Sequence, residues 1–362
     1  MRTLILTGFP GFLGSELLPR LLSRDPDTRA ACLVQPKYLA LARQRAAEIK
    51  AAHPALAGRI ELALGDITRP GLGLDDAGRL ATTVAEIHHL AAIYDLSVRR
   101  EVAEPVNVEG TRHVLDFAGR CPRLERLHYV STCYVSGRYP GTFHESDLDV
   151  GQTFNNAYEA TKYHAEILVQ SAMQAGLPAT IYRPAIVVGD SRSGATQKYD
   201  GPYFVMQWLL CQPRVAVMPV IGDTRRYALN VVPRDFVVDA IAALSARVDT
   251  AGGVFHLADP APLTVDRMID VLARATDRRV VRLPLPKRLA KLALAHVPGV
   301  YRLLRIPASA IDYFVHPTHY ATAATEAALA PSGVRCPPFE TYAERLVAFM
   351  RAHPQLSAAP MA

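Results

Sequence analysis

The sequence predicts an α/β protein: a doubly wound parallel sheet followed by a smaller mixed α/β lobe. In its first half, short apolar runs alternate with amphipathic stretches of helical length, the pattern of parallel strands joined by helical crossovers. After Val188 this alternation ends in a polar, turn-rich stretch over 189–204. We therefore expect one domain over 1–188 and a second lobe over 189–362, which partly returns to the sheet through Gly253–Leu257.

The expected strands are apolar runs that a parallel sheet would bury on both faces. They are Leu4–Thr7, Ala30–Val34, Ile60–Leu64, Glu86–Ala91, Leu127–Ser131 and Thr180–Val188. Three intervening stretches have the spacing of amphipathic helices, namely Leu39–Ala51, Val106–Gly119 and Ala157–Ala175. Gly176 and Pro178 end the last of these helices.

Three glycines follow the first expected strand and open a helix. Gly8 permits a tight turn, Gly11 lets backbone amides approach a pyrophosphate, and Gly14 allows close packing of helix on strand. The helix N-terminus adds a partial positive charge for the anion. We expect a Rossmann-type dinucleotide site here, with Phe12 and Leu13 as part of the binding loop.

The residues after the second strand favour NADPH as the cofactor. An acid at this position would bind the ribose 2′-hydroxyl and repel a 2′-phosphate. No acid occurs between Asp27 and Glu48, whereas Lys37, Arg43 and Arg45 follow the strand. The alternative is that these cations form only the solvated face of the next helix.

Other strand ends complete the expected cofactor pocket. Asp66 closes the third strand, where it could hold the adenine amine, and small residues end the fourth strand. The remaining positions expected at the cofactor are Ile67, Ala91, Ala92 and Pro184. Adjacent strand residues point to opposite faces, so His88 and His89 cannot bind one ion, and we expect no metal.

Tyr158 and Lys162 are four residues apart on one face of an expected helix. The ammonium of Lys162 can lower the pKa of Tyr158 and hold a nicotinamide ribose. Tyr158 can then protonate a carbonyl oxygen while a hydride reaches the carbon. Thr132 would hydrogen-bond the same oxygen. Ser131 competes for that role, and strand alternation lets only one of the two face the site; we prefer Thr132.

The net charge of +6 is concentrated in one segment. Six cations and no acid lie within 280–306: Arg282, Lys287, Arg288, Lys291, Arg302 and Arg305. A nucleic-acid-binding protein would spread basic residues over a domain face, so we expect no nucleic-acid partner. The segment could dock an acyl-carrier protein, hold coenzyme A phosphates or contact a membrane surface. It could equally be a solvated basic face.

Compartment and assembly follow from weaker signals. Five cysteines without a CxxC pair fit a reduced, cytoplasmic protein, in which Cys133 is a small buried residue. No stretch reaches the length of a membrane span. The helices over 106–119 and 157–175 could pair two copies, so a homodimer is plausible.

Several segments together resemble the extended (atypical) short-chain dehydrogenase/reductases, closest to the fatty acyl-CoA reductase and thioester reductase branch. These segments include TGFPGFLGSELL, LGDITRPGLGL, HHLAAIYDLSV, VNVEGTRHVLDFA, HYVSTCYVSG, YEATKYHAE and YRPAIVVGDSRSG, within 2–194. The resemblance implies NADPH and a catalytic set of Thr132, Tyr158 and Lys162. It also implies reduction of an acyl thioester to an aldehyde, and in some members on to the alcohol. The branch usually has Arg where this chain has Gln35.

The same catalytic set fits other substrates. An NADPH-dependent ketone or aldehyde reductase, acting on a 3-oxoacyl or hydroxysteroid-like compound, is the main alternative. A sugar-nucleotide epimerase is less favoured because such enzymes tend to carry an acid after the second strand. A cofactor-binding sensor is disfavoured because the Tyr–Lys pair is present. Aromatic residues in 198–210 and beyond 312 could line an acyl pocket, or could simply pack the lobe.

Overall fold

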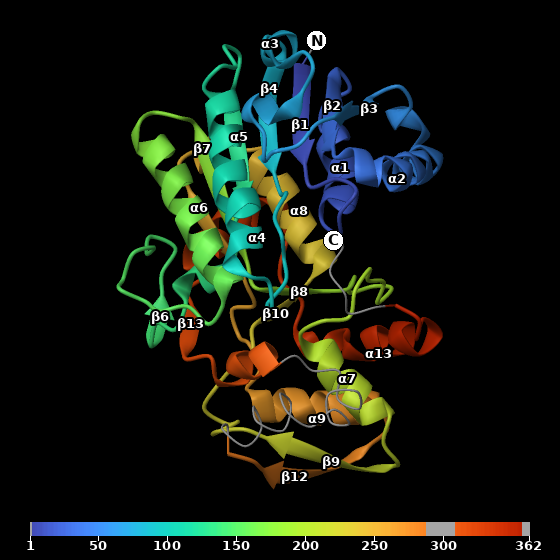
Figure 1. The fold of residues 1–362 in the computed structure, drawn as a ribbon. Helices are drawn as coiled ribbons and strands as arrows, with labels where there is room; N and C mark the ends of the chain where they lie inside the picture. The colour runs from blue at the N-terminus through green and yellow to red at the C-terminus, as the bar shows by residue number, and fades with distance from the viewer. Residues whose placement is uncertain (1, 287–307, 357–362) are drawn as a thin grey trace.

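A seven-stranded parallel sheet forms the centre of the computed structural model, which describes residues 2–286 and 308–356. Its strand order is β11-β7-β5-β4-β1-β2-β3 (Figure 1). The strands are β1 (Arg2–Thr7), β2 (Thr28–Val34), β3 (Ile60–Leu64), β4 (Val84–His89), β5 (Arg126–Val130), β7 (Ala179–Pro184) and β11 (Val254–Leu257). The order reverses at β1, as in doubly wound folds, and the predicted fold class is confirmed.

Helices cover both faces of this sheet (Figure 1). On one face, α1 packs on α8, and their apolar side chains join those of α2 in one core. On the other face, α4, α5 and α6 pack together over a second core. The bounds are α1 (Gly14–Leu22), α2 (Leu39–Ala52), α4 (Arg100–Glu104), α5 (Gly110–Ala118), α6 (Ala157–Gln174) and α8 (Arg234–Ser245), with the short α3 (Ala77–Ala81) near the amino ends of the strands.

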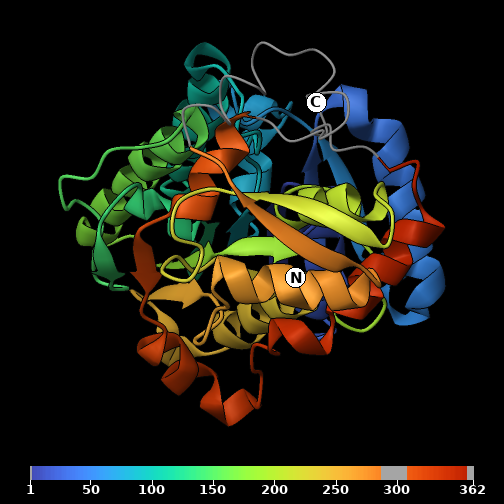
Figure 2. The same cartoon turned by 90° about the horizontal axis from the view of Figure 1, so that it is seen from below.

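The smaller lobe lies beyond the carboxyl ends of the strands (Figures 1 and 2). Three two-stranded parallel pairs belong to this side of the molecule: β8 with β10, β9 with β12, and β6 with β13. Their bounds are β6 (Gly141–Phe143), β8 (Ile186–Val188), β9 (Val215–Val220), β10 (Val231–Pro233), β12 (Arg279–Pro284) and β13 (Thr318–Tyr320). The helices of this lobe are α7 (Pro202–Leu210), α9 (Val265–Ala275) and α13 (Ala343–Ala352), whereas α12 (Ala323–Leu329) packs against α8 and β11 of the main domain.

Two expected elements differ in detail. The strand expected over 180–188 divides into β7 and β8, because the Ala185 amide bonds to the Leu257 carbonyl while β8 turns to pair with β10. The helix expected over 106–119 starts with a π-helical turn over Pro105–Glu109 before α5 begins.

The larger part of the segment over 198–210 forms α7, most of whose side chains are buried in the core of the lobe. This packing favours the ordinary buried helix over a wall of an acyl tunnel. Within the described residues, no helix combines the length and hydropathy that crossing a membrane would require.

Candidate active site

The glycine turn after β1 presses directly on the end of β4. Gly8 has a positive φ of 87°, and a Cβ on it would lie 2.9 Å from the Ala91 amide nitrogen. A Cβ on Gly14 would lie 2.7 Å from the Gly8 carbonyl oxygen. Both positions therefore require glycine. These close contacts hold the turn against the start of α1, whose N-terminus suits a pyrophosphate, so the residues present fit a dinucleotide.

The cations beyond β2 are only partly available. Lys37 and Arg43 are exposed, and the ammonium of Lys37 lies 4.8 Å from the centre of the Tyr38 ring. Arg45 is instead engaged by Glu48, at 2.7 Å. Lys37 and Arg43 thus remain the candidate partners of a 2′-phosphate.

Asp66 and Ile67 have structural partners at the end of β3. Burial would raise the pKa of Asp66, but hydrogen bonds from Thr68 and Gln35 hold it below its ordinary value. The carboxylate therefore stays ionised, and it accepts hydrogen bonds from the amide and the hydroxyl of Thr68 in the turn that follows β3. The side chain of Ile67 is buried against Gly110 of α5, and its carbonyl accepts a hydrogen bond from His113 at 2.8 Å.

Thr132 and Tyr158 meet at the carboxyl end of β5. Their side chains are hydrogen-bonded, and each residue is less than a tenth exposed. The Thr132 hydroxyl also donates to the Pro184 carbonyl at 3.4 Å. Burial raises the pKa of Tyr158 above its ordinary value, and the bond to Thr132 opposes that rise. Tyr158 is therefore a neutral phenol at physiological pH, which is the form that can donate a proton.

Ser131 faces the other way. Its hydroxyl donates to the Glu166 carboxylate at 2.5 Å. Glu166 also pairs with Arg183 at 2.6 Å, and both side chains of this pair are fully buried. Strand alternation thus turns Thr132 toward Tyr158 and Ser131 toward a buried ion pair.

Lys162 lies deep beneath the site. Its ammonium donates to the Tyr129 hydroxyl and to the Val130 carbonyl, both at 2.8 Å. Burial lowers its pKa to about 7, with the charge of Glu166 acting in the opposite direction. The expected lowering of the Tyr158 pKa by Lys162 is not seen in this structure, where burial of the phenol dominates.

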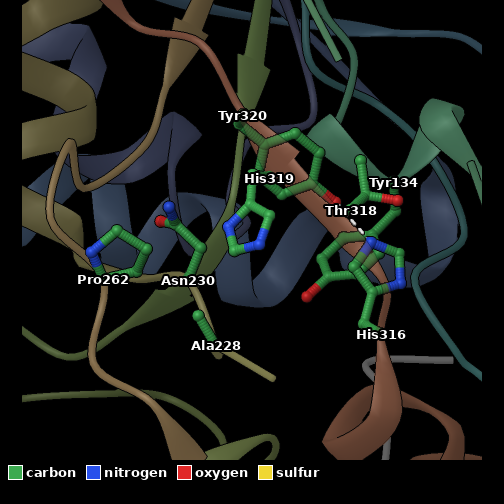
Figure 3. Close-up of a pocket in the computed structure, with 8 residues that line it drawn as sticks. All are labelled: Tyr134, Ala228, Asn230, Pro262, His316, Thr318, His319 and Tyr320. Carbon is green, nitrogen blue, oxygen red and sulfur yellow. Dashed lines mark hydrogen bonds between the residues drawn. The ribbon is translucent and has the colours of Figure 1, made fainter. Parts of the chain in front are cut away.

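Aromatic rings pack close to Tyr158. The Tyr94 ring packs edge-on against Tyr158 at 5.0 Å, and the Lys198 ammonium lies 4.6 Å from the Tyr94 ring centre. On the lobe side, Tyr134 packs against Tyr313 at 4.8 Å and His316 at 5.0 Å. Figure 3 shows the small pocket there, which Tyr134, His316 and Tyr320 border on one side and Ala228, Asn230 and Pro262 on the other.

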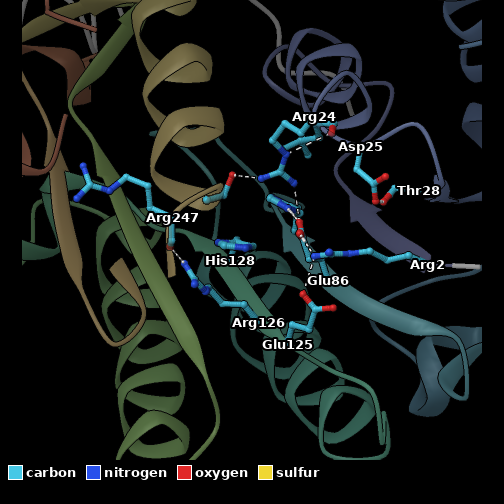
Figure 4. A network of polar contacts seen from close by, with 12 residues as sticks. Arg2, Arg24, Asp25, Thr28, Glu86, Glu125, Arg126, His128 and Arg247 are labelled. Carbon is cyan, nitrogen blue, oxygen red and sulfur yellow. Dashed lines mark hydrogen bonds and ion pairs between the residues drawn. The ribbon is translucent and has the colours of Figure 1, made fainter. Parts of the chain in front are cut away.

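The two adjacent histidines of β4 point to opposite faces, as expected. His88 lies close to Glu86 and His128, and the three together are near enough to one another to hold an ion. Figure 4 shows Glu86 and His128 of this group. However, Arg2 and Arg24 already bind the Glu86 carboxylate at 2.6 and 2.7 Å. The two imidazole rings are stacked at 4.3 Å. The carboxylate of this group is therefore already engaged by two guanidinium groups.

The basic segment over 280–306 lies largely outside the described residues. Its first cation, Arg282, is not available to a ligand, because Asp266 and Asp270 of α9 bind it at 2.9 and 2.6 Å. These acids precede the segment in sequence, which is why the local charge count did not reveal the pairing.

Sequence reasoning missed two buried residues near the site. Arg234, at the start of α8, lies 5.0 Å from the ring centre of Phe12 and so brings a cation to the glycine turn. Tyr129 holds Lys162, as described above. Neither residue belongs to a sequence motif that would have identified it. Tyr129 lies in an apolar strand, where a tyrosine is ordinarily part of the core.

This fold and site define an NAD(P)-dependent oxidoreductase of the extended short-chain dehydrogenase/reductase class. The family model described as "Male sterility protein" (NAD_binding_4) matches residues 6–241, and the chain belongs to this family.

Solved structures similar to the chain include reductase domains. The terminal R domain from the myxalamid PKS-NRPS pathway superposes with a TM-score of 0.82 at 28% identity, covering 99% of this chain and 92% of that one. The R domain of a nonribosomal peptide synthetase from Mycobacterium tuberculosis has a TM-score of 0.73 at 24% identity, covering 97% and 92%.

Among curated proteins, a linear gramicidin synthase of Brevibacillus parabrevis is 31% identical over 277 residues, 73% of this chain and 5% of that protein. Glycine betaine reductase ATRR of Emericella nidulans is 30% identical over 287 residues, which make up 75% of this chain and 22% of that protein. The chain thus spans less than a quarter of the length of these two relatives.

Proposed function

We propose that this protein is an NADPH-dependent reductase that converts an acyl thioester, bound to a carrier protein or to coenzyme A, into an aldehyde or alcohol. The observation that carries this proposal is the buried, hydrogen-bonded pair of hydroxyls on Thr132 and Tyr158. The likeness to a terminal R domain at 28% identity supports the thioester over a free ketone or aldehyde.

The proposed chemistry follows from the protonation states of these residues. Bound NADPH would supply a hydride to the carbonyl carbon. Thr132 would orient the carbonyl oxygen by hydrogen bonding, and the neutral phenol of Tyr158 would give that oxygen a proton. The hemithioacetal formed in this way would release the aldehyde when its C–S bond breaks, and its hydroxyl proton would pass to the sulfur of the departing thiol. Lys162, held from below, would stabilise the phenolate that remains. Tyr94 would limit the access of water, because its ring covers one side of Tyr158.

The preference for NADPH rests on Lys37 and Arg43, which are exposed where the 2′-phosphate would lie. Lys37→Glu should lower kcat/KM for NADPH while leaving that for NADH nearly unchanged. Lys50→Glu, the same charge change at the other end of α2, is the matched control. If kcat/KM fell equally with NADPH and NADH, Lys37 would have no role in recognising the 2′-phosphate.

A carrier protein or coenzyme A is the proposed donor of the acyl group. A relevant neighbour is described as a thiolation-reductase di-domain from an archaeal non-ribosomal peptide synthetase. In this chain, support comes from the cations of the 280–306 segment other than Arg282.

The proposed function is tested by following NADPH oxidation with a panel of substrates. Acyl-CoAs, acylated carrier proteins, 3-oxoacyl compounds and free aldehydes would be compared, and products identified by mass spectrometry. Aldehyde or alcohol from a thioester is the expected result. Turnover of the ketones alone would instead establish a carbonyl reductase and refute thioester reduction.

A further inference from the structure

A chain of buried polar side chains connects the glycine turn with Lys162. Its members are Thr7 of β1, His89 of β4, Thr111 of α5, Tyr129 of β5 and Lys162 of α6. None of these residues is more than 3% exposed. Buried polar groups cost free energy unless they are hydrogen-bonded, so the way in which these five satisfy one another is informative.

The direction of each hydrogen bond is fixed from the Thr7 end. The Thr7 hydroxyl accepts from the amides of Leu90 and Ala91, both at 3.1 Å, which uses its two acceptor sites. Its own proton therefore goes to Nδ1 of His89, 2.8 Å away. A neutral His89 then carries its proton on Nε2, and this group donates to the Thr111 hydroxyl at 3.0 Å. Burial and the nearby charge of Lys162 lower the pKa of His89 to about 3, which keeps the ring neutral.

The remaining bonds follow in turn. The Thr111 hydroxyl donates to the Asn107 carbonyl at 2.7 Å, so it accepts from His89, and it is also a hydrogen-bonding neighbour of Tyr129. The Tyr129 hydroxyl accepts from Lys162 at 2.8 Å, because an ammonium can only donate.

Lys162 is thereby left with one N–H for the active site. Its ammonium gives one N–H to Tyr129 and one to the Val130 carbonyl, its two hydrogen-bond partners among the described residues. The ammonium also lies 4.3 Å from the centre of the Tyr129 ring, whose face favours a cation.

We propose that Tyr129, oriented by Thr111 and His89, is a positioning residue that keeps Lys162 protonated and directs its third N–H into the site. This inference rests on the proposed function, which gives Lys162 its role at the cofactor and Tyr158. It also explains why β4 carries a buried histidine at His89: the ring closes the chain between Thr7 and Thr111.

The groups that face Lys162 come from three elements. Tyr129 faces it from β5 and His89 from β4, while Glu166 and Tyr158 lie one turn to either side on α6. Glu166 is the acid among them, and it is already bound by Arg183 and Ser131. Tyr129 is therefore the contact whose loss should most directly expose the ammonium to the cost of burial.

The test is the titration of Lys162 in Tyr129→Phe, a variant that keeps the ring and removes the hydroxyl. The chain has six lysines, so ¹⁵N-lysine labelling gives few NMR signals, and Lys162→Met identifies the one of interest. We expect the pKa of Lys162 to fall by about one pH unit, which is a tenfold change in the protonation equilibrium. NADPH binding, followed by fluorescence, should weaken, and the alkaline limb of kcat should move to lower pH.

Matched variants separate positioning from general loss of packing. Tyr182→Phe removes another fully buried hydroxyl, which bonds to His128 at 3.0 Å, and should leave the Lys162 titration unchanged. Thr111→Val should lower the pKa of Lys162, as Tyr129→Phe does. Thr111→Ser, which keeps a hydroxyl, should leave the pKa of Lys162 at its wild-type value. If Tyr129→Phe does not fold, the two Thr111 variants carry the test.

An unchanged Lys162 titration in a folded Tyr129→Phe or Thr111→Val protein would overturn the proposal, as would an equal shift in Tyr182→Phe. Failure of the proposed function would look different. Full activity of Tyr158→Phe would refute the chemistry while leaving the titration result intact.

Discussion

Acidification should destabilise this protein between pH 7 and pH 5 through its buried histidines. His89, His256 and His316 are each at most 4% exposed, and burial lowers the pKa of each to about 3. Their ordinary value in an unfolded chain is about 6.5. Because the folded state binds fewer protons than the unfolded state, the stabilisation is complete above pH 6.5 and is lost as pH falls below it.

The magnitude follows from the same values. At pH 5 each histidine lies about 1.5 units below its unfolded pKa, so protonation in the unfolded chain costs about 2 kcal/mol of stability per residue. The three together give about 6 kcal/mol, a large share of the about 5–15 kcal/mol by which domains are stable. Glu86 acts in the same direction only at lower pH, because burial opposes but does not overcome the partners that depress its pKa.

Urea unfolding at a series of pH values, followed by circular dichroism, measures this effect. His316→Gln should reduce the loss between pH 7 and pH 5 by about 2 kcal/mol, because one of the three groups is removed. His53→Gln, at an exposed position, should leave the loss unchanged. A wild-type loss below about 1 kcal/mol would mean that these histidines titrate normally when folded, which would refute the reasoning.

Three further predictions concern the site and its support. Tyr158→Phe should lower kcat by a factor on the order of 10² or more with little change in NADPH affinity, since it removes the proton donor; steady-state kinetics would exclude that role if kcat were unaffected. Gly8→Val should abolish NADPH binding in titrations, because its Cβ would lie 2.9 Å from the Ala91 amide nitrogen; retained binding in a folded variant would contradict the assignment of the turn. Arg183→Met should cost about 3–5 kcal/mol in urea unfolding by leaving Glu166 buried without its partner, and the double change with Glu166→Leu should recover most of that loss.

Apart from the division into β7 and β8, the sequence predicted the strands of the main sheet to within two residues at each end, because buried parallel strands are apolar runs bounded by turns. It also predicted that Ser131 and Thr132 face different ways, since alternation is a local property. The sequence could not predict the hydrogen-bond partner of the Ser131 hydroxyl. The partners of that hydroxyl, Glu166 and then Arg183, come from other elements, and only the fold brings them together.

The local count of charged residues was the sequence feature that predicted the structure least well. The cations near 282 looked unopposed because the acids that bind Arg282 precede it by 12 and 16 residues on α9. Tyr129 illustrates the converse case. A tyrosine in an apolar strand is ordinarily core, and only its contact with Lys162 distinguishes it. Residues that act through a second residue have no spacing rule of their own, so sequence alone does not reveal them.

The two histidines of β4 show why the face of a strand matters more than the position along it. His88 and His89 are adjacent, and both are buried and neutral. His88 faces α1 and α8, where Glu86 and the arginines around it form a self-contained ion network (Figure 4). His89 faces α5 and α6, the side on which Lys162 lies. A charge change at His88 should therefore act on stability, whereas one at His89 should also reach the site, because only the second face carries the bonds that end at Lys162.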